Sequence, residues 1–201
     1  MPARVATALV LGITTAVLLT ALFAFPRIEA FYISRSQDEG RATLRLVSGA
    51  VHQAIGRYDP VPRLIAGEPK FRELLLESDN DGVVPFVNEK LRLTALSVAA
   101  SEIYVMDTTG LTIASSNYRE ATSFVGQNFA FRPYFKRALA GESAQFHAVG
   151  AISGERGFFF AAPILDGIDV IGVLALKVSV DALEGAWDGL TREIIVADQN
   201  G

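Results

Sequence analysis

The 201-residue chain contains no cysteine and only two histidines. The absence of cysteine excludes disulfides and thiolate metal ligands, and it fits an exported bacterial domain without requiring one. His52 and His147 are far apart in the sequence and lack the spacing of a histidine metal site. An excess of positive charge is also absent, because 22 acidic residues outnumber 18 lysines and arginines and the formal net charge is −4 at pH 7. We therefore expect neither a metal ion nor nucleic acid as a partner.

Catalytic motifs are missing as well. The sequence has no nucleotide-binding glycine loop and no nucleophile elbow. The glycines of GAISGERG, residues 150–157, have the wrong spacing for a phosphate-binding loop. The chain is therefore expected to contain no catalytic residue and to bind no cofactor of its own.

Half of the residues are hydrophobic, and many of them lie at the N-terminus. Val5 to Phe25 contains no charged residue, and about 21 helical residues span roughly 30 Å, the thickness of a bilayer core. A cleaved signal peptide would have an apolar region of about 7–15 residues and a clear cleavage site, whereas the site near Ala24 is poor. We predict a transmembrane signal anchor over residues 1–27.

The orientation of this segment is less well marked. Four arginines lie after the apolar run, at positions 27, 35, 41 and 45, and such a distribution does not favour export of the C-terminal part of the chain. The very short leader ahead of the run is nevertheless typical of a signal anchor. We therefore expect the N-terminus inside and the remainder of the chain in the periplasm of a bacterium.

Residues 28–60 are predicted to form one long helix that ends at the prolines of YDPVP. Apolar residues repeat along it at steps of three and four, as in a helix with one apolar face. Ordinary core packing and pairing with a second copy of the chain both explain this pattern, and we expect a homodimer. The residues of the repeat are Leu44, Val47, Val51, Ile55 and Tyr58.

Two shorter helices come next, over PKFRELLLES and VPFVNEKLRLTALSVAA. The second has four candidate core residues, which are Phe86, Leu91, Leu93 and Leu96.

From residue 102 the period changes from helical to alternating, and five strands are predicted, with one helix after Arg132. This order predicts an α+β domain with a five-stranded antiparallel sheet and helices on one side. Residues 181–201 are predicted to form a connecting helix and the first strand of a second domain, so the chain is expected to be a fragment.

Arg132 lies in the segment NFAFRPYFKRAL, among four aromatic residues. Pro133 suits the first position of a helix, so Arg132 is predicted to lie at the N-cap, where anions are favoured. The planar guanidinium matches a carboxylate, and the rings reduce the local polarity. Two interpretations remain open, because Arg132 either binds a carboxylate or is structural, stacked on rings and bonded to a loop carbonyl.

Lys177 is the only positive charge in the apolar segment GVLALKVSV. Strand alternation places its side chain on the same face as Val173 and Ala175. A lysine in a central strand is costly unless it is paired, whereas at an edge its amine can reach water. Two cations on either side of one pocket would suit a ligand with two carboxylates, so Arg132 and Lys177 are predicted to bind its two ends.

Four segments resemble the sensing region of bacterial four-carbon dicarboxylate sensor histidine kinases. They are VMDTTGLTIASSNY, SFVGQNFAFRPYFKRALAGE, GERGFFFAAPI and GVLALKVSVDALE, and the resemblance is strongest from Ile103 to Trp187. It implies a periplasmic double-PAS (dCache) region. Residues 61–180 would then form the membrane-distal PAS-like domain, and residues 181–201 would begin the truncated membrane-proximal one.

The resemblance also implies a binding site. In the similar proteins, the arginine of FRPYF and the strand lysine hold the ligand carboxylates, and these fall on Arg132 and Lys177. A hydroxyl in the loop before the aromatic strand falls on Ser153. Aromatic residues expected around the ligand are Phe129, Tyr134 and Phe159. The sequence departs from the pattern at Phe129, Phe158, Phe159 and Ala161, where Tyr or Ser is common, and each departure removes a hydroxyl.

The leading functional hypothesis is the ligand-sensing region of a two-component sensor histidine kinase of the bacterial inner membrane. The expected ligand is a small dicarboxylate such as succinate, malate or fumarate. The resemblance implies that ATP, magnesium and a response regulator concern only the kinase part outside this chain. Two alternatives remain open: the sensor of a chemoreceptor or cyclic-nucleotide-signalling protein, and a membrane-tethered interaction module without a small ligand.

Overall fold

The computed structural model describes residues 2–77 and 82–181. These residues divide into two compact units, the first ending at Gly49 and the second beginning at Ala50, and each is described by itself. The helix and strand predicted for residues 181–201 lie outside the described residues, apart from residue 181. The predicted domain boundaries stay predictions.

Helix α1 runs from Pro2 to Gly56 without the division expected near residue 27. It ends just before the segment with Pro60 and Pro62, as predicted from the missing amide hydrogens of these residues. Within the part of the chain that the structure describes, no helix has the length and hydropathy needed to cross a membrane. The signal anchor over residues 1–27 stays a prediction.

Three short helices come after α1: α2 (Val61–Ala66), α3 (Pro69–Leu76) and α4 (Val83–Val98). The prediction for the core face of α4 was mostly wrong. Leu91 is fully buried, but Phe86, Leu93 and Leu96 are 53%, 54% and 68% exposed. The face that packs on β1 and β2 includes Val87, Asn88, Leu91 and Ala95. It combines large, polar and small side chains, so hydrophobicity alone selects the wrong face of the helix.

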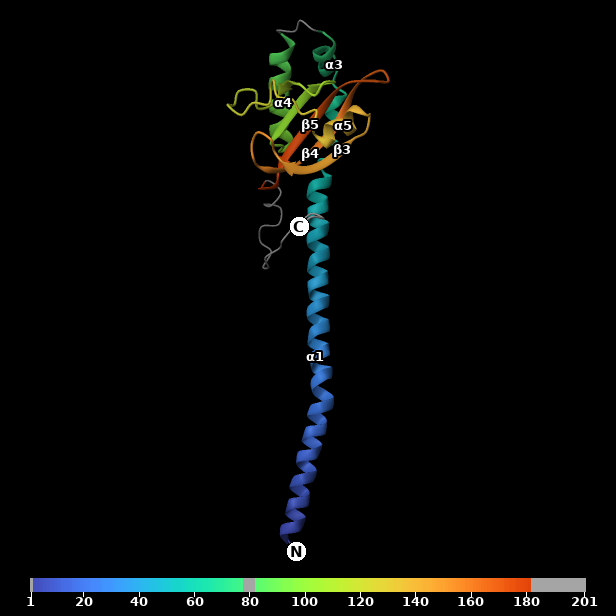
Figure 1. Ribbon diagram of the computed structural model, residues 1–201, viewed down its shortest axis with the longest axis vertical. Coiled ribbons are helices and arrows are strands. Elements are labelled where there is room, and N and C mark those ends of the chain that lie inside the picture. The colour runs from blue at the N-terminus through green and yellow to red at the C-terminus, as the bar shows by residue number, and fades with distance from the viewer. Residues whose placement is uncertain (1, 78–81, 182–201) are drawn as a thin grey trace. The chain divides into compact units, whose positions relative to one another are not determined.

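Five strands form one antiparallel sheet: β1 (Glu102–Asp107), β2 (Thr112–Ser115), β3 (Ala144–Val149), β4 (Arg156–Asp166) and β5 (Asp169–Ser179). Their order is β2-β1-β5-β4-β3, so the last strand inserts beside the first (Figure 1). This confirms the predicted α+β class and five-stranded sheet. The long β4 and β5 form the centre, which makes Lys177 a residue of an interior strand rather than of an edge.

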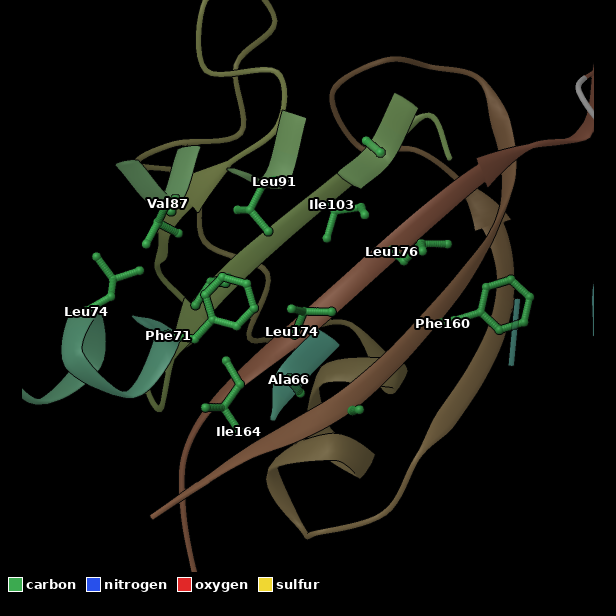
Figure 2. Packing of buried hydrophobic residues seen from close by; sticks show 14 of the residues in the cluster. Ala66, Phe71, Leu74, Val87, Leu91, Ile103, Phe160, Ile164, Leu174 and Leu176 are labelled. Carbon is green, nitrogen blue, oxygen red and sulfur yellow. The ribbon is translucent and has the colours of Figure 1, made fainter. Parts of the chain in front are cut away.

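Both faces of the sheet are covered, so the prediction of helices on one side only was wrong. Helices α2, α3 and α4 pack against one face, where Figure 2 shows side chains of α3 and α4 near Ile103, Leu174 and Leu176. Helix α5 (Pro133–Leu139) packs against β3, β4 and β5 on the opposite face. Alternation along β4 and β5 sends successive apolar residues to the two cores, which explains their nearly continuous hydrophobic sequences.

The turn between β1 and β2 fixes the loop that leads to Arg132. Asp107 Oδ1 accepts hydrogen bonds from the amides of Thr109 and Leu111, at 2.8 and 3.0 Å, as predicted for a turn aspartate. Gly110 has φ +84°, and its carbonyl accepts from the amide of Phe129 at 2.9 Å. A Cβ at Gly110 would lie 2.6 Å from the Ala130 nitrogen, so only glycine permits this close approach.

Candidate ligand-binding site

Arg132 is the N-cap residue of α5, with Pro133 in the first turn, as the sequence predicted. The helix has only seven residues, and the Arg132 side chain makes no capping hydrogen bond. Its Nη2 instead donates to the carbonyl oxygen of Val149 at 2.9 Å. The guanidinium carbon lies 5.1 Å from the Phe131 ring centre and 5.8 Å from that of Phe159. These contacts match the structural interpretation of this arginine.

One donor of Arg132 is nevertheless unused. Its Nε is buried and has no hydrogen-bond partner among the described residues. Buried N–H groups in folded proteins are nearly always paired with protein, water or ligand. The guanidinium thus combines a structural contact with a free donor that an acceptor group of a ligand can satisfy.

Lys177 is fully buried on β5, and it is paired. Its Nζ donates to Ser153 Oγ at 2.9 Å and forms ion pairs with Glu102 at 3.3 Å and with Glu155 at 3.5 Å. Glu102 is the direct neighbour of Lys177 in the β1–β5 register. This pairing offsets the cost of placing an ammonium in a central strand.

Glu102 is the more deeply buried of the two carboxylates, since its side chain is 14% exposed and that of Glu155 is 64% exposed. Burial raises the pKa of Glu102, and the attraction of Lys177 offsets this only in part. Glu102 Oε2 has no hydrogen bond within the described structure, so its contact with Lys177 is an ion pair without good hydrogen-bond alignment. The negative charge of Glu102 is therefore stabilised mainly by Lys177.

Ser153 lies in the tight loop that connects β3 and β4. The amide of Gly150 donates to the carbonyl of Glu155 at 2.8 Å, and the amide of Gly154 donates to that of Gly150 at 3.0 Å. A Cβ on Gly150 would come within 2.4 Å of Ser153 Oγ. Glycine at position 150 is therefore what permits the Ser153 hydroxyl to reach Lys177.

The aromatic residues of the predicted site form one buried group. Tyr134 stacks on Phe159 with ring centres 5.3 Å apart, and its hydroxyl lies 2.7 Å from that of Tyr104. Phe129 packs 5.5 Å from the Tyr104 ring. Burial raises the pKa of Tyr134 to about 12 and that of Tyr104 well above its usual value. Both phenols are therefore neutral at pH 7 and act as hydrogen-bonding groups.

The two cations border this aromatic group. Phe159 is the register partner of Lys177 on the neighbouring strand, so both side chains project from the same face of the sheet. The Arg132 guanidinium lies beside the Phe159 ring. The predicted site residues Arg132, Lys177, Ser153, Phe129, Tyr134 and Phe159 therefore gather around the sheet face that α5 covers.

Sequence comparison identifies relatives of this chain. No family model matches it. It is 32% identical over 173 residues to the C4-dicarboxylate transport sensor protein DctB of Pseudomonas aeruginosa, an alignment that covers 86% of the chain and 28% of that protein. The solved sensor domain of the V. cholerae histidine kinase DctB has a TM-score of 0.73 and 32% identity, covering 77% of this chain and 60% of that one.

The chain is a homologue of the sensor protein DctB. This confirms the resemblance found in the sequence, and it makes the described domain a sensor module. The chain spans 28% of the length of the curated DctB relative, so the activity and partners of a whole DctB-type protein are matters for proposal. The Campylobacter jejuni chemoreceptor Tlp3 ligand-binding domain has a TM-score of 0.58 and 15% identity over 71% of the chain, which shows a common fold alone.

Three residues of the site were missed in the sequence analysis: Glu102, Tyr104 and Glu155. Alternation in EIYVMD places Glu102 and Tyr104 on one strand face, but the sequence does not reveal that β1 pairs with β5. Glu155 lies next to glycine in a loop, where an acidic residue is usually only solvated. Its proximity to a buried lysine gives it a role that spacing in the sequence cannot indicate.

A separate cleft of about 470 Å³ lies between α2, α3, the end of β4 and the segment before β3, and it is lined in part by Arg63 and Arg72. Both arginines are already engaged. Arg63 donates to Ser143 Oγ at 3.1 Å, and Arg72 pairs with Asp166 at 3.4 Å. Over residues 2–77 and 82–181, no three acidic or histidine side chains are grouped as metal ligands. The aromatic group with Arg132 and Lys177 remains the best candidate site of this domain.

Replacing Tyr134 with Phe should destabilise the domain, because the hydroxyl of Tyr104 is fully buried and would lose its partner. We expect a loss of about 1–3 kcal/mol in the free energy of unfolding, measured by urea denaturation at pH 7. The double variant Tyr104→Phe/Tyr134→Phe is the control, since removing both hydroxyls leaves none unpaired. A double variant less stable than the single one would contradict the importance of this pair.

Proposed function

We propose that this chain is the ligand-sensing region of a DctB-type two-component sensor histidine kinase and that it binds a small dicarboxylate. The observation that carries the proposal is the placement of Arg132 and Lys177 next to Phe159, at the sheet face that α5 covers, in a homologue of a C4-dicarboxylate sensor. One carboxylate of the ligand binds the guanidinium, and the other binds the ammonium.

The chemistry of the site supports an anionic ligand of small size. The buried Nε of Arg132 is a free donor, and Lys177 is an ammonium whose other contacts include an exposed, displaceable acid. Phe129 and Phe159 replace the tyrosines that are common in similar proteins, so two hydroxyl donors are missing. Ligand contacts therefore depend more on the two cations and on Ser153 than on phenol groups.

The wider setting is part of the same proposal. The sensing region lies in the periplasm, held at the inner membrane by the predicted anchor over residues 1–27, and it works as a homodimer through α1. ATP, magnesium and the response regulator belong to the kinase part of the protein outside this chain. Ligand binding changes the packing of the dimer helices, which passes the signal across the membrane.

Isothermal titration calorimetry on the full chain in detergent micelles tests the ligand class. Succinate, malate and fumarate should bind, whereas acetate and propionate should bind at least about tenfold more weakly. A monocarboxylate leaves one cation without a new partner, and a charged hydrogen bond is worth about 1.5–3 kcal/mol. Equal affinity for succinate and propionate, or no binding of any dicarboxylate by folded protein, would reject the dicarboxylate proposal.

A second candidate function is supported by one observation. An interaction module without a small ligand requires the cations to be satisfied by acidic groups of the chain, and Lys177 does contact Glu102 and Glu155. Under this alternative, no dicarboxylate produces heat in the same titration, and Arg132 acts only through Val149 and the rings. The chemoreceptor alternative shares the sensing chemistry and differs only in the output part.

A further inference from the structure

Both cations of the proposed site hold the same segment, the connection between β3 and β4. Arg132 donates to the carbonyl of Val149 at its beginning. Lys177 contacts Ser153 Oγ and the Glu155 carboxylate at its end. A ligand that binds both cations must therefore share or replace contacts that this connection already makes.

Groups of the chain already surround Lys177 Nζ. Within the described structure, one of its three N–H donors makes a hydrogen bond, to Ser153 Oγ, and both carboxylate contacts are ion pairs. In the described structure three oxygens lie around Nζ: Ser153 Oγ at 2.9 Å, Glu102 at 3.3 Å and Glu155 at 3.5 Å. Because the Lys177 side chain is fully buried, a ligand carboxylate reaches Nζ only when one of these three groups moves aside.

Glu155 is the group that costs least to displace. Glu102 is fixed by the β1–β5 register and is 14% exposed, so its release would leave a charge buried without a partner. Glu155 is 64% exposed and comes directly after Gly154, which has φ +70°. Its carboxylate can rotate toward the solvent without a desolvation cost, and its distance from Nζ is the longest of the three.

We propose that Glu155 is an internal carboxylate that occupies the position of the ligand carboxylate at Lys177 and competes with the ligand for it. The inference rests on the proposed function and deepens it, because it assigns to Glu155 a part in setting the affinity. Without ligand, Glu155 holds the β3–β4 connection over the buried ammonium. With ligand, the carboxylate of the ligand takes this place and Glu155 moves into solvent.

The charges of the site support this exchange. Arg132 and Lys177 contribute two positive charges, and Glu102 and Glu155 contribute two negative charges close to Lys177. A dicarboxylate that entered beside both acids would meet a neutralised lysine and like charge. When Glu155 leaves, the ligand end at Lys177 restores the same number of carboxylates around the ammonium.

The first test measures succinate binding by calorimetry for the wild-type chain, Glu155→Gln and Glu142→Gln. Glu142 is a matched control, because it is also 64% exposed and also forms an ion pair, with Arg137 at 3.3 Å. Removing the internal competitor should tighten binding about threefold to tenfold in E155Q, in line with the modest strength of exposed ion pairs. E142Q should bind like the wild type.

The second test does not use the ligand. Acetic anhydride modification of the ligand-free chain is followed by mass spectrometry, with the exposed Lys136 as internal reference. Lys177 is fully buried, and Glu155 helps to close the β3–β4 connection over it. Lys177 should therefore be modified at least about threefold faster in E155Q than in the wild type or E142Q. This factor corresponds to the modest strength of an exposed ion pair.

The outcomes separate the two proposals. If the wild type binds succinate and E155Q binds it equally or more weakly, the competition by Glu155 is rejected and the proposed function stands. If no dicarboxylate binds either protein, the proposed function fails and the competition fails with it, whatever the modification rates. Equal modification of Lys177 in all three proteins rejects the closing role of Glu155 even where binding is intact.

Discussion

Replacing Lys177 with methionine is expected to lower the free energy of unfolding of the domain by about 3 kcal/mol. The ammonium is fully buried and neutralises Glu102, which is 14% exposed and lies opposite it in the sheet. Without Lys177, a carboxylate remains in an apolar environment without a partner, while methionine fills most of the same volume. Urea denaturation followed by circular dichroism measures the loss.

The double variant Glu102→Gln/Lys177→Met provides the control for this prediction. It removes both charges, so most of the stability should return, because replacing a buried ion pair by uncharged groups is often neutral. A double variant as unstable as Lys177→Met would show that the lysine stem, rather than its charge, stabilises the sheet. The lysine stem lies close to Gly157, where an added Cβ would be 3.3 Å from it.

The instability of Lys177→Met should also depend on pH. Burial already raises the pKa of Glu102 in the wild type, and loss of the lysine removes the opposing attraction. The pKa of a glutamate carboxyl is about 4.3 in the unfolded state. When folding raises this pKa, the group stabilises the folded state fully below the unfolded pKa. This stabilisation is lost as the pH rises through the folded pKa. The deficit should therefore be larger at pH 8 than at pH 5, and a deficit independent of pH would contradict the assignment to Glu102.

Replacing Arg132 with alanine is expected to weaken succinate binding by about tenfold to over a hundredfold. Each hydrogen bond to a charged group is worth about 1.5–3 kcal/mol, and a tenfold change in affinity corresponds to 1.4 kcal/mol. The variant also removes the contact with the Val149 carbonyl, so its folding must first be verified by thermal denaturation. Calorimetry then gives the affinity.

Two further variants make this result interpretable. Arg132→Lys should restore only part of the affinity, because an ammonium cannot reproduce the planar, two-pronged guanidinium. Arg137→Ala removes the same charge from the same helix at an exposed position, where Arg137 pairs with Glu142, and it should leave binding unchanged. If Arg132→Ala, correctly folded, binds succinate as the wild type does, the arginine is structural.

The position of Arg132 shows how far the sequence could be interpreted. Pro133 and the aromatic residues predicted the helix start and the buried rings around it, because proline geometry and ring burial are local properties. A structural arginine bonded to a carbonyl was one of two open interpretations, and the structure identifies the carbonyl as that of Val149. It depends on where β3 ends relative to α5, and no spacing within NFAFRPYF contains that information.

Helix α4 illustrates the opposite case. Its existence was predicted from the helical repeat, yet Phe86, Leu93 and Leu96 are exposed, and Asn88 is buried instead. Asn88 Oδ1 accepts a hydrogen bond from the amide of Ser115 on β2 at 2.8 Å, which satisfies the buried amide. A polar core residue of this kind is recognised only when its partner on another element is known.

The sequence by itself determined the five strands, the α+β class, the turn at Asp107 and the resemblance to dicarboxylate sensors, because alternation, turn chemistry and motif similarity are encoded within short segments. It also singled out Lys177 as an unusual charge in an apolar strand. Only the tertiary structure decided that Glu102 and Glu155 surround this lysine, since β1 pairs with β5 across about 70 residues of sequence. Strand pairing at such a distance depends on the packing of the whole sheet, and for that reason the acids that set the charge of the site could not be predicted from the sequence.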